Sequence, residues 1–277
     1  MPELPEVETT VLSLRTKVLN KAFVRVWTEN EREDLKNLVK RKINKIERFG
    51  KGIYFFLDDN NILYIHLRMT GHLLLGNWEM EKNRVWKSEE KILQEGKNGF
   101  LCYIFFLNDG KQLALSDPRK FAKVSLLTEK ELEIYLKKIG KDALKIKKEE
   151  FVKLFEGKKK EIKPLLMDQS FLSGIGNIYA AEILFKAKIN PKKRANLLKK
   201  EELEKIYDFT QSILKQALKL KGDSTSDYRL LDGKKGGYQN HHLVYNRKNL
   251  PCFLCQNKIK REVVGGRGTY FCSNCQN

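Results

Sequence analysis

The sequence lacks the features of a membrane or secreted protein. None of its apolar runs approaches the roughly 18 residues that a membrane-spanning helix needs. Its first residues are acidic and their apolar side chains are spaced apart, whereas a signal peptide has a basic start and a continuous apolar segment. These two absences predict a cytoplasmic protein with no membrane partner.

Cysteine is scarce, and its distribution argues against a disulfide-stapled fold. Of the five cysteines in 277 residues, Cys102 is isolated and the other four are crowded near the carboxyl end. Without a secretory signal, such crowding indicates metal binding in a reducing compartment. Internal repeats with periods of about 20–50 residues are also missing.

Negative charge is in short supply as well. The chain carries 54 Lys+Arg against 35 Asp+Glu, a formal net charge of +19. A field of one sign attracts polyanions, and nucleic acid is favoured over an anionic membrane surface as the partner. A genome-wide drift toward lysine codons would explain only part of this excess.

The apolar pattern changes along the chain. Apolar residues at helical spacing predict a first helix from about Pro5 to Leu19. Over the next hundred residues, short apolar runs are separated by turn signals such as DDNN and NDGK, which predicts an antiparallel sandwich or flattened barrel. The polar stretch 77–99 has no clear period, and we expect it to be a surface excursion.

The second half of the chain is predominantly helical in pattern. Thr128 and Glu131 form a capping box, so we expect a helix to begin there and a domain boundary to lie nearby. Helical segments follow from Glu149 to Leu220, broken at SGIGN and INPKK. Residues 221–242, rich in Gly, Asp, Ser and Lys, predict a long loop that is either a functional lid or disordered.

The most specific motif is CFLCQNKIKREVVGGRGTYFCSNC. Two Cys-x-x-Cys knuckles, Cys252 with Cys255 and Cys272 with Cys275, flank two predicted strands around a glycine turn. Knuckles on such a hairpin place four thiolates tetrahedrally around one structural zinc, although disulfide or redox use is an alternative. A closed site has no vacancy for substrate, so we expect the metal to fold the module. Arg267, in the glycine-flanked turn, is suited to offer a guanidinium to phosphate.

Two further segments are suited to nucleic-acid binding. The Gly174–Gly176 turn breaks one helix and Asn177 opens the next, and a helix N-terminus beside such a turn can bind a phosphate. Helical hairpins with glycine turns are also common without any function. In SDPRKFA, a turn at Asp117 is expected to lift Arg119 and Phe121 out of a sheet edge. Phe121 would then be a wedge for a base stack, or else a core residue at a hairpin corner.

The opening MPELPEVETT allows two interpretations. Proline suits a first helical turn, and Glu3, Glu6 and Glu8 suit the positive end of a helix. Alternatively, removal of Met1 would leave Pro2 with a free secondary amine that could act as a nucleophile.

Five motifs occur in a fixed order: PELPEVE, HLRMTG, SDPRKF, DQSFLSGIGNIYAAE and the four-cysteine ribbon. Together they make the whole chain resemble the bacterial formamidopyrimidine-DNA glycosylase family of repair enzymes. The resemblance implies an α+β multidomain fold and a monomer with one structural zinc ion and no other cofactor. Its domains would be an N-terminal catalytic helix and β-sandwich (2–127), a helical helix-two-turn-helix DNA-binding domain with a lesion-covering loop (128–237) and a zinc finger (238–277).

The resemblance also implies an activity. It is that of a bifunctional DNA glycosylase and AP lyase of base excision repair, which removes 8-oxoguanine and formamidopyrimidines from double-stranded DNA. The enzyme then nicks the abasic strand by β,δ-elimination, at the bacterial nucleoid. Two alternatives stay open: the sister branch that acts on oxidised pyrimidines, and a zinc-ribbon protein that binds damaged DNA without chemistry.

The resemblance assigns catalytic roles to five residues. Pro2 would attack C1′ of the damaged nucleotide, since an α-amine has a reference pKa of roughly 7.7–8.0 against roughly 10.4 for lysine. Glu3 corresponds to the acid–base carboxylate, and Glu6 to a second carboxylate that supports it. Lys51 would assist elimination and contact phosphate or the lesion. Arg267 would bind the phosphate beside the lesion and take part in the second elimination, the alternative being a plain phosphate contact.

The resemblance also assigns residues that bind DNA. A base that leaves the stack leaves a gap, and Met69, Arg119 and Phe121 correspond to the side chains that fill it. Arg119 would face the orphaned cytosine. The residues that bind the DNA backbone have counterparts in Lys158, Lys163 and Asn177.

Overall fold

The computed structural model describes residues 1–82 and 85–277, which form two compact units. Unit 1 consists of Met1–Lys137 and Leu220–Gln239, and unit 2 of Lys138–Lys219 and Asn240–Asn277. The chain therefore passes between the units three times. The three domains expected from the sequence stay a prediction, because this division groups segments only by how they pack.

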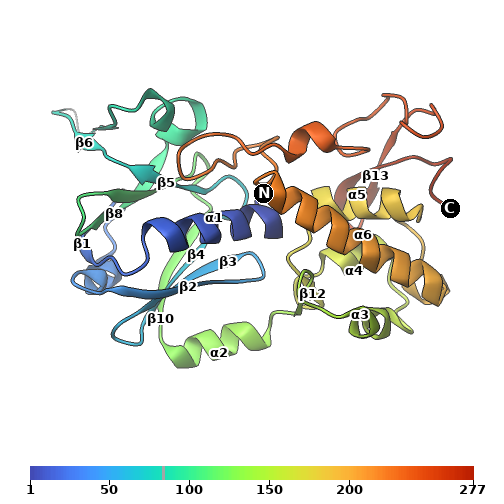
Figure 1. Ribbon diagram of the computed structural model, residues 1–277, viewed down its shortest axis with the longest axis horizontal. Coiled ribbons are helices and arrows are strands. Elements are labelled where there is room, and N and C mark those ends of the chain that lie inside the picture. The colour runs from blue at the N-terminus through green and yellow to red at the C-terminus, as the bar shows by residue number, and fades with distance from the viewer. Residues whose placement is uncertain (83–84) are drawn as a thin grey trace. The chain divides into compact units, whose positions relative to one another are not determined.

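Unit 1 begins with helix α1 (Leu4–Lys17), close to the predicted bounds, and continues with two antiparallel four-stranded sheets (Figure 1). The first sheet has the order β1-β8-β9-β5, with strands Phe23–Thr28, Leu101–Leu107, Gln112–Ser116 and His72–Gly76. The second has the order β10-β4-β3-β2, with strands Lys123–Leu127, Ile62–His66, Gly52–Leu57 and Ile43–Phe49.

Both sheets and α1 contribute side chains to one core. Phe105 of β8, Ile65 of β4 and Val11 of α1 are all fully buried in it. Two antiparallel sheets that share a core form a sandwich, so the predicted fold class is confirmed. A 3-10 helix at Glu33–Leu38 adds Leu35 to the same core.

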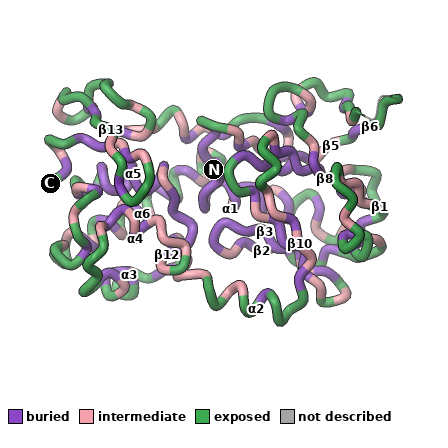
Figure 2. Tube along the Cα trace, turned by 180° about the vertical axis from the view of Figure 1, so that it is seen from behind, coloured by how far each residue is buried: buried purple, intermediate pink, exposed green. Residues whose placement is uncertain are grey.

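The outer faces of the two sheets are covered as well. Ile104 of β8 packs with Trp78 and Leu93, while Tyr64 of β4 packs with Leu132 of α2 (Glu129–Lys137). Strands such as β3 are consequently buried along nearly their whole length (Figure 2). Burial on both faces explains why the sequence shows continuous apolar runs in place of a clean alternation.

The polar stretch 77–99 was expected to be a surface excursion, and that expectation is only partly right. It contains short elements, namely β6 (Glu79–Met80), β7 (Trp86–Lys87) and 3-10 helices at Lys91–Leu93 and Gly96–Gly99. Residues 83 and 84 lie outside the described residues. The buried side chains of Trp78 and Leu93 anchor the stretch to the sheet, because the outer face of that sheet needs an apolar cover.

The predicted capping box at the start of α2 is confirmed. The backbone N–H of Thr128 donates to Glu131 Oε2 (2.8 Å), and the N–H of Glu131 donates to Thr128 Oγ1 (3.3 Å). These reciprocal bonds satisfy two backbone donors that have no partner within the first helical turn.

The predicted long loop is irregular apart from a 3-10 helix at Tyr238–His241. Its segment 220–239 belongs to unit 1, where the N–H of Leu75 at the edge of the first sheet donates to the carbonyl of Leu231 (2.8 Å). Tyr228 and Leu231 are buried. A few apolar side chains therefore hold a segment whose composition is mostly polar.

Unit 2 is largely helical. Its elements are β11 (Lys141–Asp142) paired in parallel with β12 (Leu172–Ser173), α3 (Lys148–Phe155), α4 (Ile162–Met167), α5 (Asn177–Ala187), a 3-10 helix at Ala195–Leu197, α6 (Lys200–Lys219), β13 (Lys260–Val264) and β14 (Arg267–Phe271). The predicted helix start at Asn177 and the predicted two-stranded ribbon are both confirmed. Ala181 and Phe185 of α5 pack against Ile259 of the ribbon.

None of the helices in the described ranges combines the length and apolar composition that a lipid bilayer requires.

Candidate functional site

The first residues of the chain are held by a carboxylate clamp. The N–H of Glu3 donates to Glu6 Oε2 (2.7 Å), and the N–H of Asp223 donates to Glu6 Oε1 (2.7 Å). Glu3 and Glu6 are almost fully buried, and Pro2 is buried beside them. The helix-start interpretation of these glutamates is thus confirmed, and the same bonds fix the residue that follows Pro2 to the segment 220–239.

Glycine is required where that segment meets the clamp. Gly222 has φ +81, and a Cβ at this position would lie 2.8 Å from Glu6 Oε1. A side chain there would displace the carboxylate that holds Glu3.

Lys51 lies in the two-residue loop between β2 and β3, after Gly50 with φ 56. It is buried, with 7% of its surface exposed. Arg48 joins this loop to α1, because its Nη1 donates to the Gly50 carbonyl (2.7 Å) and its Nε donates to the carboxylate of Glu8. The structure therefore fixes Lys51 to the helix that begins at the clamp. Sequence reasoning missed Arg48, whose only signal was a basic residue within an apolar strand pair.

The field of three cations, one of them Lys51, acts on His66. Burial lowers the pKa of His66 to about 4, with further lowering by the cations Arg68, Lys51 and Lys123. His66 is therefore neutral at physiological pH, and its Nδ1 accepts a hydrogen bond from the backbone N–H of Arg68 (3.0 Å). Such a field suits an anionic ligand such as phosphate.

Met69, Arg119 and Phe121 form what we call the exposed triad. Met69 and Phe121 are 42% and 52% exposed, unusual values for large apolar side chains. Arg119 lies between them, with Nη1 3.7 Å from Met69 Sδ and its guanidinium carbon 4.6 Å from the centre of the Phe121 ring. The alternative that placed Phe121 in the core is wrong. The structure brings together two apolar side chains and a guanidinium, which together could enter a base stack.

In unit 2, a buried lysine connects two helices with the ribbon. Lys163 on α4 is fully buried, and its Nζ donates to Asn177 Oδ1 and to Thr269 Oγ1, both at 2.6 Å. Asn177 at the start of α5 donates in turn to the Gly268 carbonyl (3.0 Å). The next residue toward the ribbon turn, Arg267, is exposed. Sequence reasoning missed Thr269, which lies within the ribbon motif but was assigned no role there.

Lys158 is placed differently from Lys163. It is exposed and follows α3, with its ammonium 5.7 Å from the centre of the Phe171 ring. Its side chain is therefore accessible to a ligand, whereas that of Lys163 is covered.

The four ribbon cysteines fit one metal ion. The sulfur atoms of Cys252, Cys255, Cys272 and Cys275 all lie within 4.8 Å of one another, and two of the pairs are 3.9 and 3.5 Å apart. A tetrahedral zinc with Zn–S bonds of about 2.3 Å needs sulfur atoms about 3.8 Å apart. The chain thus carries the site of one structural zinc, with all four ligand positions taken by thiolates.

Three family models match the chain. They are described as the formamidopyrimidine-DNA glycosylase N-terminal domain (residues 1–124), the formamidopyrimidine-DNA glycosylase H2TH domain (139–229) and the zinc finger found in FPG and IleRS (249–277). The formamidopyrimidine-DNA glycosylase of Mycoplasma genitalium is 35% identical over 288 aligned residues, which cover 100% of this chain and 96% of the relative.

Two solved structures of Lactococcus lactis Fpg are similar to this chain. A variant in complex with a Fapy-dG-containing DNA has a TM-score of 0.85 and is 31% identical, covering 99% of both chains. The complex of the enzyme with an abasic-site DNA has a TM-score of 0.84 at the same identity and coverage.

Proposed function

Since the chain belongs to the formamidopyrimidine-DNA glycosylase family of DNA-binding repair enzymes with a zinc finger, we propose that it excises oxidised purines from duplex DNA. We propose further that it nicks the resulting abasic strand through a Schiff base on Pro2. Relatives bind DNA that contains Fapy-dG or an abasic site, which supports both halves of this activity. A DNA-bound monomer at the chromosome is the expected working state.

The clamp on Glu3 is the observation that carries the proposal. A nucleophile at the end of a chain is useful only if its position is fixed, because a freely moving amine loses the advantage of proximity. Glu6 fixes the N–H of Glu3 from one side and the N–H of Asp223 from the other. Pro2 is adjacent to this clamp and has a ring that further limits its motion.

The chemistry proceeds in two stages. Once Met1 is removed, the unprotonated nitrogen of Pro2 adds to C1′, and the damaged base leaves with a proton. Glu3 donates a proton to the opening sugar oxygen, and a cationic iminium forms between the proline nitrogen and C1′. Loss of a proton from C2′ then expels the 3′ phosphate, a second elimination expels the 5′ phosphate, and water releases the amine.

Cations and the exposed triad support these steps. Lys51, one of the three cations whose field acts on His66, is suited to assist elimination and to hold phosphate. Arg267 on the ribbon is proposed to bind the phosphate next to the lesion, and Lys158, Lys163 and Asn177 to hold the DNA backbone. The exposed triad would fill the gap left by the extruded base, with Arg119 facing the opposite cytosine.

Borohydride trapping tests the proposed nucleophile. We expect the wild-type chain to form a covalent adduct with a duplex that contains 8-oxoguanine, and the cross-linked peptide to begin at Pro2. A variant with one uncleaved residue ahead of Pro2 has an amide nitrogen at this position, so it should bind the duplex without forming an adduct. The matched control carries the same extra residue at the carboxyl end and should react like the wild type.

The outcomes separate the possible functions. DNA binding without any adduct would mean that the chain binds damage but does not cut it. An adduct in the variant blocked at Pro2 would contradict the assignment of the nucleophile. Faster excision of an oxidised pyrimidine than of 8-oxoguanine would place the substrate in the sister class.

A further inference from the structure

The exposed triad comes from two loops, and one buried hydrogen bond joins these loops. Met69 lies on the loop between β4 and β5, whereas Arg119 and Phe121 lie on the loop between β9 and β10. The hydroxyl of Thr70, next to Met69, donates to the carboxylate of Asp117. Asp117 is fully buried and Thr70 is 6% exposed, so water cannot easily replace this bond.

The same carboxylate organises its own loop. Asp117 Oδ1 accepts the N–H of Arg119 (3.1 Å), and its Oδ2 accepts the N–H of Ala122 (2.7 Å). These bonds span the segment that carries Arg119 and Phe121. One side chain therefore holds both the shape of this loop and its link to Thr70.

Both loops have strained backbone conformations next to the triad. Arg68, which precedes Met69, has φ 53, and Lys120, which precedes Phe121, has φ 55. A residue with a Cβ adopts this conformation only when its surroundings enforce it. The loops also approach closely, since a Cβ on Gly71 would lie 3.2 Å from Ala122 Cβ on the other loop.

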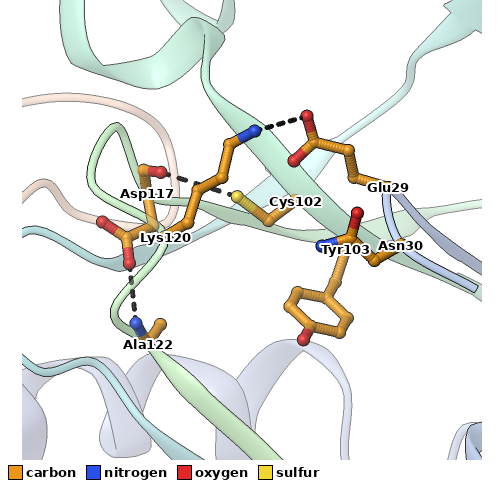
Figure 3. A pocket seen from close by; sticks show the side chains of 7 residues that line it. All are labelled: Glu29, Asn30, Cys102, Tyr103, Asp117, Lys120 and Ala122. Carbon is orange, nitrogen blue, oxygen red and sulfur yellow. Dashed lines mark hydrogen bonds and ion pairs between the residues drawn. The ribbon is translucent and has the colours of Figure 1, made fainter. Parts of the chain in front are cut away.

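Packing holds the second loop only in part. Ala122 packs against the core of unit 1, but the loop also borders a cavity of about 70 Å³, lined by Glu29, Asn30, Cys102, Tyr103, Asp117, Lys120 and Ala122 (Figure 3). The pair of Lys120 with Glu29 crosses it (2.7 Å), but both side chains are more than a third exposed, so this pair adds little. Besides the packing of Ala122, the bonds of Asp117 therefore support the loop.

We propose that Thr70 and Asp117 are positioning residues that hold the exposed triad as one rigid group and thereby set how strongly the enzyme discriminates between bases opposite the lesion. This inference rests on the proposed function. To recognise a base edge by hydrogen bonds, the guanidinium of Arg119 must be placed to within a fraction of an ångström. This accuracy requires a guanidinium whose loop is held in one position. If the two loops separate, Met69 and Phe121 can still fill space, but Arg119 no longer distinguishes cytosine from adenine.

The test compares Thr70→Val with the wild type on three substrates. Valine keeps the shape of threonine and removes the hydroxyl that bonds to Asp117. We expect excision of 8-oxoguanine opposite cytosine to fall about tenfold, the effect of losing a buried hydrogen bond to a charged group. The preference for cytosine over adenine should fall with it. Nicking of an abasic site in single-stranded DNA should be unchanged, because that substrate has no opposite base to recognise.

Matched variants separate positioning from stability. Thr210→Val removes another fully buried threonine hydroxyl, which donates to the Ile206 carbonyl (2.7 Å) in α6, and it should leave the cytosine preference unchanged. Asp117→Asn should weaken the preference in the same direction as Thr70→Val. When combined with Thr70→Val it should add less than its separate effect, because both changes break the same link.

Three results would overturn the inference. They are an unchanged cytosine preference in Thr70→Val, an equal loss on single-stranded DNA, and full additivity of the two substitutions. If the wild type excises nothing, it is the proposed function that fails. The preference for cytosine over adenine is then measured as the ratio of the affinities for two abasic-site duplexes, one with cytosine and one with adenine opposite the site. Thr70→Val must again reduce this ratio.

Discussion

His72 is a fully buried histidine that connects three parts of unit 1. It lies on β5, and its Nε2 is 2.9 Å from Oδ1 of Asn98 in the stretch 77–99. Asn98 Nδ2 donates in turn to the Gly233 carbonyl (3.2 Å) in the segment 220–239. Since the amide of Asn98 uses its nitrogen as a donor, its oxygen accepts, and Nε2 of His72 carries the proton. A neutral histidine therefore contributes to holding the loop in place.

This histidine predicts a dependence of stability on pH. Burial lowers the pKa of His72 to about 4 from 6.5. As pH falls, His72 is therefore protonated in the unfolded chain before it is protonated in the folded one. Its contribution to the free energy of unfolding is complete above pH 6.5 and is lost between about pH 6.5 and 4. By pH 4 the free energy of unfolding has fallen by about 3 kcal/mol.

Urea unfolding at pH 7 and at pH 4.5 measures this contribution. We expect His72→Gln to lose less stability than the wild type over that interval. His241→Gln, at an exposed position, serves as the control and should behave like the wild type. Equal losses in all three proteins would mean that His72 does not titrate as expected.

Among single residues, the side chains with a recognisable chemical role could be predicted from the sequence. The residues that hold those side chains in position could not. Arg119 and Phe121 were found because an arginine and an aromatic residue next to a turn have a recognisable role. Glu6 was expected to support Glu3, but its bond to Asp223 could not be found in this way, since the two residues are far apart in the sequence and nothing around Asp223 points to Glu6. The burial of Lys163 was missed because a lysine in a basic run is normally exposed.

The ribbon and α5 share a small apolar cluster. It includes Val244 and Ile259, and all four zinc ligands belong to it or pack against it. A hairpin with so little buried apolar surface depends on its metal for folding. Since Arg267 lies in this hairpin, the metal also fixes the proposed phosphate contact.

Removal of zinc should therefore unfold the ribbon alone. We predict that a strong chelator abolishes the protection of amides in Lys260–Val264 and Arg267–Phe271 against hydrogen exchange, and that it weakens DNA binding. Strand Leu101–Leu107 of unit 1 should keep its protection. Cys102→Ser should bind one zinc ion like the wild type, whereas Cys272→Ser should not. A ribbon that stays protected after zinc has been removed would contradict this prediction.

Elements with local signals were predicted well. Helix α1 and the capping box of α2 depend on residues close in sequence, and so does the two-stranded ribbon. The strand order β1-β8-β9-β5 could not be predicted, because it depends on pairings between distant segments. The hydrogen bond from the N–H of Leu75 to the carbonyl of Leu231 is another such pairing. No periodic pattern in the nearby sequence predicts it.

The charge of the whole molecule dominates its expected affinity for DNA. At +19, the chain should bind duplex DNA of any sequence, and each phosphate contact releases counterions. Five cations have been proposed to contact DNA: Lys51, Arg119, Lys158, Lys163 and Arg267. Arg119 is proposed to face a base and the side chain of Lys163 is covered, which leaves three cations for direct phosphate contacts. Three contacts give a slope of roughly −2.7 in log affinity against log salt concentration.

We therefore predict that affinity for undamaged duplex falls about fortyfold between roughly 50 and 200 mM salt. Fluorescence anisotropy over a salt series measures this slope. Lys158→Ala should reduce the slope by about one, whereas Lys36→Ala, at an exposed lysine paired with Glu33, should leave it unchanged. A nearly flat response would contradict electrostatic binding.

The passage of the chain between its units has a consequence for synthesis on the ribosome. The last piece of unit 1, Leu220–Gln239, lies in the sequence between the two pieces of unit 2. A nascent chain consequently cannot close the clamp on Glu6 until Asp223 has emerged, when α4 and α5 have already been made. A chain that terminates before Asp223 lacks the bond from this residue to Glu6, next to Pro2. Unit 1, which would cut DNA, is therefore completed only after α4 and α5 of unit 2, which would bind it, have been synthesised.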